Sequence, residues 1–325
     1  MSDITENGGT SQTILKVVGV GGAGINAVNA MIEAKVQGVE FICVSISPKR
    51  LRFSKAPIQL MIGSDPRGLS TGGNLDSARQ AVAQHKQALA EILHNADMVF
   101  IAAGMGSGTG TGATPMIAQI ARECGALVVG VVTTPFRYEG KKRMSIAQSG
   151  IDELALHTDC LIVISNEQLV SISEKGTPLL DAFKPADEIL RQAIQGIAEL
   201  ITSSGRINAD FNDVRTVMLE RGATMIGMGT ARGENRAVEA STKAVKTPLM
   251  METDLQGARG LIINITASED MTLEEFDTVT KFFHDRMAAE ANIIIGLVID
   301  DEMKGQIKVT VIATGLSGRS SASSK

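Results

Sequence analysis

The chain has 325 residues, 44% of them apolar, so it is long enough to bury a core of ordinary size and to form two domains. Its 31 basic and 36 acidic residues leave a net charge of −5 and form no basic tract, which argues against a nucleic-acid partner. Cys43, Cys124 and Cys160 are too far apart for a zinc site or a disulfide framework, and residues 1–12 carry no apolar signal segment. We therefore expect a cytoplasmic protein that does not insert directly into a membrane.

Apolar, β-branched runs alternate with helical patterns through the first half of the chain, after a polar N-terminus (residues 1–12) that we expect to be disordered. This alternation is typical of an α/β domain with a Rossmann-like, doubly wound parallel sheet, which we place at residues 13–184. The expected strands are 14–20, 39–46, 98–103, 126–134 and 160–165, and the expected helices are 25–35, 76–93, 114–124 and 141–156.

A long helical pattern follows, with a proline in its first turn and a glycine just beyond its end. We predict that this central helix, at residues 185–205, bridges to a smaller α+β domain at residues 206–316. Thr272 and Glu275 form a capping box at the start of one helix of that domain. Residues 317–325 are rich in serine and are expected to be disordered. The expected strands of this half are 224–229, 260–266, 292–298 and 307–313, and the expected helices are 235–245 and 273–287.

Two glycine-rich turns each follow a predicted strand and precede a helical pattern: Gly19–Gly24 and Gly104–Gly112. Because glycine has no side chain, a phosphate can reach the backbone N–H groups of such a turn, and the following helix points its positive end at the anion. Both turns lie at carboxyl ends of parallel strands, which is the edge where open α/β sheets bind ligands. Together they indicate a nucleotide polyphosphate site.

The first turn by itself also fits the dinucleotide fingerprint G-x-G-x-x-G, which is a weak signal when it occurs alone. An NAD site would need an acidic residue at the end of the second strand, and residues 44–50 contain none. Lys49 and Arg50 could instead hold the extra phosphate of NADP. An NADP-dependent oxidoreductase therefore stays open as an alternative, although it leaves the second turn without a purpose.

The second turn and the blocks at 102–106, 136–143, 208–218 and 309–315 resemble the signatures of the tubulin and FtsZ GTPases. The resemblance is to the FtsZ branch of this family and extends over residues 16–315. It implies a GTP-binding, GTP-hydrolysing cytoskeletal protein that polymerises head to tail into filaments, as in the bacterial cell-division ring.

By this resemblance, GTP or GDP would occupy a pocket between the two turns, and Mg²⁺ would be bound mainly through the phosphates and not by side chains. Asn166 and Asp187 would read the base, since a carboxylate accepts from N1–H and the exocyclic amine of guanine, which adenine cannot supply. Phe183 would stack on the base, and Glu139 would contact the ribose. The other residues implied in nucleotide binding are Gly21, Gly22, Ala23, Gly24, Ile25, Asn26, Gly106, Gly108, Thr109, Gly110, Thr133 and Arg143.

Three further residues, Asn208, Asp210 and Asp213, follow the predicted central helix and are expected on the far side of the first domain from the glycine turns. The resemblance implies that this acidic loop enters the nucleotide pocket of the next subunit, where its carboxylates orient the attacking water. The protein would then be its own partner in a head-to-tail homopolymer, and hydrolysis would require assembly.

The chain also departs from the family pattern. Ser45-Ile46-Ser47 stands where the family has Asn-Thr-Asp, so a carboxylate on the nucleotide side is missing. The loop at 68–76 and Ser107 also differ from the family pattern. These changes leave open a hydrolysis-impaired or specialised paralogue that co-assembles with full-length FtsZ. The chain stops soon after the predicted core, so we expect the adaptor-binding C-terminal peptide to be absent and any membrane-associated assembly to be reached through partners.

Overall fold

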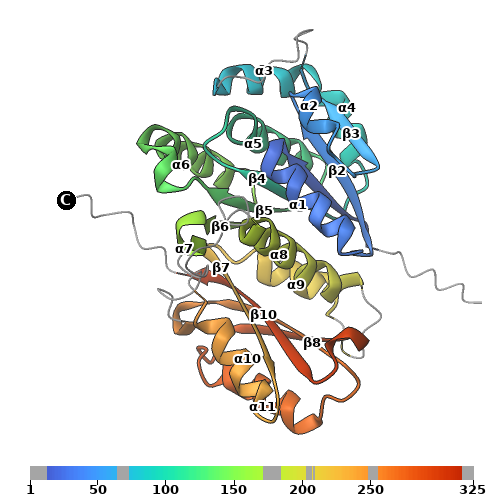
Figure 1. Cartoon of the computed structure of the whole chain (residues 1–325), viewed down its shortest axis with the longest axis vertical. Coiled ribbons are helices and arrows are strands. Elements are labelled where there is room, and N and C mark those ends of the chain that lie inside the picture. Colours follow the sequence, from blue (N-terminus) through green and yellow to red (C-terminus); the bar gives the residue numbers. More distant parts are fainter. Residues whose placement is uncertain are drawn as a thin grey trace, which may run out of the picture.

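The two halves of the chain lie one above the other in the computed structural model, with helix α8 (Lys184–Thr202) across the middle (Figure 1). The expectations for residues 1–12 and 317–325 fall outside the part of the chain that the structure describes. The described residues are 13–63, 73–170, 184–202, 207, 209–247 and 255–316.

The first half contains parallel strands in the order β3-β2-β1-β4-β5-β6. All residues of the first strand are buried, which is the usual state of a parallel strand covered by helices on both faces. The strands are β1 (Leu15–Val20), β2 (Val39–Ser45), β3 (Ile58–Met61), β4 (Met98–Gly104), β5 (Leu127–Thr134) and β6 (Cys160–Ser165).

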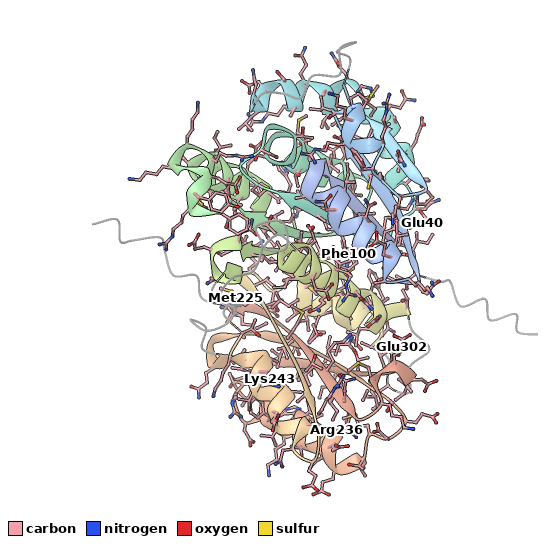
Figure 2. The ribbon with its side chains drawn as sticks, viewed as in Figure 1. Glu40, Phe100, Met225, Arg236, Lys243 and Glu302 are labelled. Atoms are coloured by element: carbon pink, nitrogen blue, oxygen red, sulfur yellow. The ribbon has the colours of Figure 1, made fainter. Side chains whose placement is uncertain are left out.

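Helices cover both faces of this sheet. They are α1 (Gly21–Glu33), α2 (Pro48–Leu51), α3 (Leu75–Gln84), α4 (Lys86–Leu93), α5 (Gly108–Glu123), α6 (Lys141–Ala155) and α7 (Asn166–Val170), with a 3-10 turn at Arg137–Glu139. Helices α1 and α8 pack on the face that presents Val17 and Phe100, whereas α3, α4, α5 and α6 pack on the face that presents Val18 and Ile101. Phe100, labelled near the middle of the molecule in Figure 2, is fully buried. The predicted doubly wound sheet is confirmed.

The second half is an α+β arrangement. Strands β7, β10 and β8 pair antiparallel, and β9 runs parallel to β8. Two of its helices cover one face, and α8 covers the other together with the short helix that follows it. The elements are β7 (Ala223–Arg232), β8 (Gly260–Ala267), β9 (Asn292–Ile299), β10 (Gln306–Leu316), α9 (Phe211–Met218), α10 (Arg236–Val245) and α11 (Leu273–His284), with 3-10 turns at Leu255–Gly257 and Asp301–Met303.

Helix α8 holds the two halves together. Leu190, Ile194 and Ile197 are fully buried in a cluster that includes Phe100 of the first half and Ile312 of the second. The two sheets also meet directly, through one pairing between β6 and β7. The central helix that the sequence predicts therefore bridges the two halves, while the expected boundaries at 184/185 and 205/206 stay predictions.

The predicted capping box at the start of α11 is confirmed. Thr272 Oγ1 accepts from the Glu275 N–H at 3.2 Å, and a Glu275 carboxylate oxygen accepts from the Thr272 N–H at 2.9 Å. The same carboxylate pairs with Arg236, which Figure 2 labels in the lower half of the molecule and which also pairs with Asp270. These contacts fix the start of α10 against the start of α11.

Several element boundaries differ from the sequence prediction. Helices α1 and α5 begin at Gly21 and Gly108, inside the glycine turns, because the first turn of a helix needs no intrahelical partner for its N–H groups and tolerates glycine there. The single helix expected at 76–93 is two helices that break at His85, where φ is −110° and ψ is 16°. The sequence pattern did not predict the edge strand β3 or the helix α9.

Candidate functional site

A cleft of about 1170 Å³ opens at the carboxyl ends of β1, β4 and β5. Its walls come from both glycine turns, from the start of α6 and from the starts of α7 and α8. The parallel sheet therefore brings together segments that lie far apart in the sequence, at the edge where α/β sheets bind ligands. The predicted nucleotide-binding residues that line the cleft are Gly21, Gly22, Ala23, Asn26, Gly106, Gly108, Thr109, Thr133, Glu139, Arg143, Asn166 and Asp187.

Three predicted residues of the glycine turns, Gly24, Ile25 and Gly110, are buried and are not among the residues that line the cleft. A Cβ atom at Gly24 would lie 2.3 Å from the Ala102 carbonyl oxygen, and one at Gly110 would lie 2.2 Å from the Gly104 carbonyl oxygen. Both contacts are far too short, so these glycines allow α1 and α5 to pack closely on β4. Their role in the structure is to position the wall of the cleft.

Ser107, the unusual residue of the second turn, is the N-cap of α5. Its Oγ accepts from the Gly110 N–H at 3.2 Å and donates to the Gly104 carbonyl at 3.3 Å. The Gly106 N–H is also used within the protein, since it donates to Thr111 Oγ1 at 2.8 Å. The N–H groups of Gly108 and Thr109, in the first turn of α5, have no intrahelical acceptor, and a helix start of this kind is suited to bind an anion.

Two polar side chains lie at the other end of the cleft, at the starts of α7 and α8. Asn166 is 8% exposed, and within the described part of the chain its side-chain oxygen is buried without a hydrogen-bond partner. Burial raises the pKa of the Asp187 carboxyl to about 6. An unsatisfied amide oxygen and a partly buried carboxyl are costly unless a ligand provides partners, so this end of the cleft is suited to a polar, planar group.

Glu139 and Arg143 form an ion pair on the rim of the cleft. Glu139 Oε1 also accepts from the Phe136 N–H at 3.0 Å, and Arg143 Nε donates to the Gly106 carbonyl at 3.4 Å. The pair therefore ties the start of α6 to the second glycine turn. Because Glu139 offsets the charge of Arg143, the positive charge of this wall comes largely from Lys142, which also lines the cleft and which the sequence analysis missed.

The wall beside the first glycine turn is positively charged, and the described residues that form it include no acidic group. Ser45 and Ser47 line it, with the Ser47 N–H donating to Ser45 Oγ at 3.1 Å, and Lys49 and Arg50 follow in α2. Nowhere among the described residues do three His, Cys, Asp or Glu side chains gather in a way that could hold a metal ion. The described side chains therefore do not fit a protein-held Mg²⁺ site.

The acidic loop lies apart from the cleft of its own chain. Asp210 and Asp213 are both exposed and neither lines the cleft. Asp210 is the N-cap of α9, where its side chain accepts from the Asn212 N–H at 2.8 Å. The predicted residues Asn208 and Phe183 lie outside the described residues.

Two family descriptions match the chain. The Tubulin/FtsZ family GTPase domain matches residues 14–174, and the FtsZ family C-terminal domain matches residues 222–317. The chain is also similar to two proteins named cell division protein FtsZ, one from Buchnera aphidicola subsp. Acyrthosiphon pisum and one from Wigglesworthia glossinidia brevipalpis. Each is 47% identical to this chain over 308 residues, which are 94% of this chain and 80% of the relative.

Solved structures agree with these matches. An empty FtsZ dimer from M. jannaschii superposes with a TM-score of 0.89 and 40% identity, covering 94% of this chain and 89% of that one. The GTPgS-bound protofilament of CetZ2 from Haloferax volcanii has a TM-score of 0.78 at 17% identity, covering 95% of both chains, and shares the fold. The matches do not favour the NADP-dependent oxidoreductase. Over the residues described, no helix has the length and apolar content needed to cross a bilayer.

Proposed function

Because this chain belongs to the tubulin/FtsZ family of GTPases, and within it to FtsZ, we propose that its cleft binds and hydrolyses GTP and that the protein polymerises head to tail. The observation that carries the proposal is that both glycine turns and the pair Asn166 and Asp187 line one cleft. The turns suit a polyphosphate, and the pair suits a base. A single ligand that spans them is a nucleoside polyphosphate.

Guanine is the base that this arrangement favours. The Asp187 carboxylate can accept from N1–H and from the exocyclic amine of guanine at once, whereas adenine offers no donor at N1. At the other end, the N–H groups of Gly108 and Thr109, which have no intrahelical acceptor at the start of α5, can donate to phosphate oxygens. Any Mg²⁺ that accompanies GTP would be held mainly by the phosphates, since the described residues include no group of three acidic, His or Cys side chains that could hold a metal ion.

Hydrolysis requires a second subunit in this proposal. Asp213 is exposed, lies outside the cleft of its own chain, and is positioned by the cap that Asp210 forms at α9. A carboxylate at this place can orient a water molecule only if it enters the cleft of a neighbour. The contact joins two different surfaces, so its repetition without closure builds a filament with GTP in each interface.

The proposed cellular setting follows the family. FtsZ relatives of this chain are cell division proteins, and we expect this protein in the cytoplasm, at a division ring or another assembly. Its proposed partners are further copies of itself and a full-length FtsZ. Binding of GTP would favour assembly, and loss of the γ-phosphate would change the charge at the interface and weaken it.

The test combines sedimentation, electron microscopy and phosphate release on one sample incubated with GTP, GDP or ATP. We expect filaments and phosphate release with GTP, and neither with ATP. Sedimented filaments that keep intact GTP would replace the proposal with a non-hydrolysing paralogue. Binding of NADP without any preference for guanine would overturn it.

A further inference from the structure

Arg50 lies over the first glycine turn. A Cβ atom added to Gly22 would lie 3.5 Å from Arg50 Cζ and Nε, so the guanidinium covers the backbone where α1 begins. The one-turn helix α2 places it there: Pro48 occupies the first turn, Leu51 is buried beneath it at 8% exposure, and Lys49 and Arg50 line the cleft. The position of the Arg50 backbone beside the first glycine turn is therefore set by an anchored segment.

No acidic side chain of the described residues neutralises this wall. The described ion pairs include neither Arg50 nor Lys49, whereas Arg143, beside the second glycine turn, is already paired with Glu139. Two cations that face a phosphate-binding turn without a counter-ion raise the electrostatic potential of the cleft. That field attracts phosphate and disfavours a divalent cation bound beside it.

We propose that Arg50 binds the phosphates of the bound nucleotide directly and takes over the neutralising role that a divalent cation usually has. The inference rests on the proposed function, since it assumes that GTP occupies the cleft. The guanidinium is planar, carries a permanent charge and offers parallel N–H donors that match two phosphate oxygens. Ser45 and Ser47, whose hydroxyls carry no charge, give a metal ion no competing anchor on this side.

The consequence is that nucleotide affinity in this protein depends weakly on Mg²⁺. The experiment measures the affinity of the full chain for GTP and GDP by fluorescence anisotropy, in Mg²⁺ and in excess EDTA. The variants are Arg50→Ala, Arg50→Lys and the double change Ser47→Asp with Arg50→Ala. Arg52→Ala is the matched control, because Arg52 is an exposed arginine in the same segment that does not line the cleft.

We expect wild-type protein and Arg52→Ala to lose less than about threefold in GTP affinity when Mg²⁺ is removed, a change of under 1 kcal/mol. Arg50→Ala should lose about tenfold or more in EDTA, with a larger loss for GTP than for GDP, because a charge-assisted contact to phosphate disappears. Arg50→Lys should fall between them, since it keeps the charge and loses the fork. The double variant should bind tightly only in Mg²⁺.

Two results would overturn the inference: a wild-type protein that loses GTP in EDTA as completely as the double variant does, or an Arg50→Ala protein that binds like Arg52→Ala in both conditions. Both results leave the proposed function standing, because GTP still binds in Mg²⁺. If wild-type protein binds no guanine nucleotide in either condition, the proposed function falls and this inference falls with it. Arg50 is exposed, so unchanged thermal unfolding of the variant will show that folding is intact.

Discussion

The Asp187 carboxyl couples guanine binding to pH. Burial raises its pKa to about 6, so in the nucleotide-free protein the group is neutral below that pH and ionised above it. Guanine N1–H and its amine need the ionised form as acceptor. We expect GTP affinity to be constant above pH 7 and to fall by up to about tenfold per pH unit below 6. Binding titrations from pH 5 to pH 8 measure this, with Asp213→Asn as a variant that keeps the wild-type profile.

Asp187 also makes the stability of the nucleotide-free protein depend on pH, but this stability falls with rising pH, whereas GTP affinity rises. A carboxyl with a raised pKa contributes stability in its neutral form, and this contribution is present at low pH and lost as the pH rises through about 6. We expect Asp187→Asn to bind guanine weakly, without the pH dependence, and to stabilise the nucleotide-free protein at pH 8 by about 2 kcal/mol. Urea unfolding at pH 5 and pH 8 measures this, and a variant whose stability relative to the wild type is the same at both pH values would contradict it.

At the residue scale, the sequence predicts most of the cleft. Gly21, Asn166 and Asp187 were assigned from the two turns and the family resemblance, and all three line it. It does not reveal that Gly110 packs on a strand while Gly108 faces the cleft, because both are glycines in one motif and only the backbone path separates them. It also missed Lys142, which reads as an ordinary solvated lysine at a helix start.

Among the elements, α5 depends on close approach to β4. A Cβ atom at Gly110 would lie 2.2 Å from the Gly104 carbonyl oxygen, whereas nothing lies within 4 Å of one at Gly257. We expect Gly110→Ala to lower the free energy of unfolding by about 2–4 kcal/mol, because the helix must shift, and Gly257→Ala to change it by less than about 0.5 kcal/mol. Equal urea midpoints for the two variants would count against this packing role.

Asp210 and Asp213, at the start of helix α9, are expected to differ in their effect on stability. Asp210 caps the helix and Asp213 does not, so Asp210→Ala should cost about 1 kcal/mol of stability and Asp213→Ala almost none. Both variants should bind GTP as the wild type does and lose turnover, since each acts on a neighbour's nucleotide. Nucleotide affinity, urea unfolding and phosphate release on the same preparations separate these effects. Loss of GTP binding in either variant would show that the loop acts within its own chain.

The elements that the sequence missed share a physical reason. Strand β3 (Ile58–Met61) has only four residues at the edge of the sheet and alternates in burial, so it lacks the long apolar run that marks β1 or β4. Helix α9 is eight residues long and buries only Val214, Val217 and Met218. The break at His85 has no proline or glycine to signal it. The long and strongly periodic helix α8 (Lys184–Thr202) begins one residue before the predicted start at 185 and ends three residues before the predicted end at 205.

For the whole molecule, the arrangement of the two halves is the central feature. Helix α8 is buried between the sheets, and it leads from the base end of the cleft, at Asp187, towards the acidic loop that precedes α9. Each chain therefore carries a cleft that is proposed to bind nucleotide and, outside it, the carboxylates that are proposed to complete the cleft of another chain. The family resemblance predicts an acidic loop remote from the cleft of its own chain, whereas composition and periodicity predict the two halves and give no reason for such a loop.

The most direct test of this account is the rate of phosphate release per subunit over a wide range of protein concentration, with saturating GTP. If the cleft is completed by a neighbour, the rate per subunit should be close to zero in dilute solution, rise above a threshold concentration and then level off as filaments form. A rate per subunit that stays constant from dilute to concentrated protein would contradict the shared site.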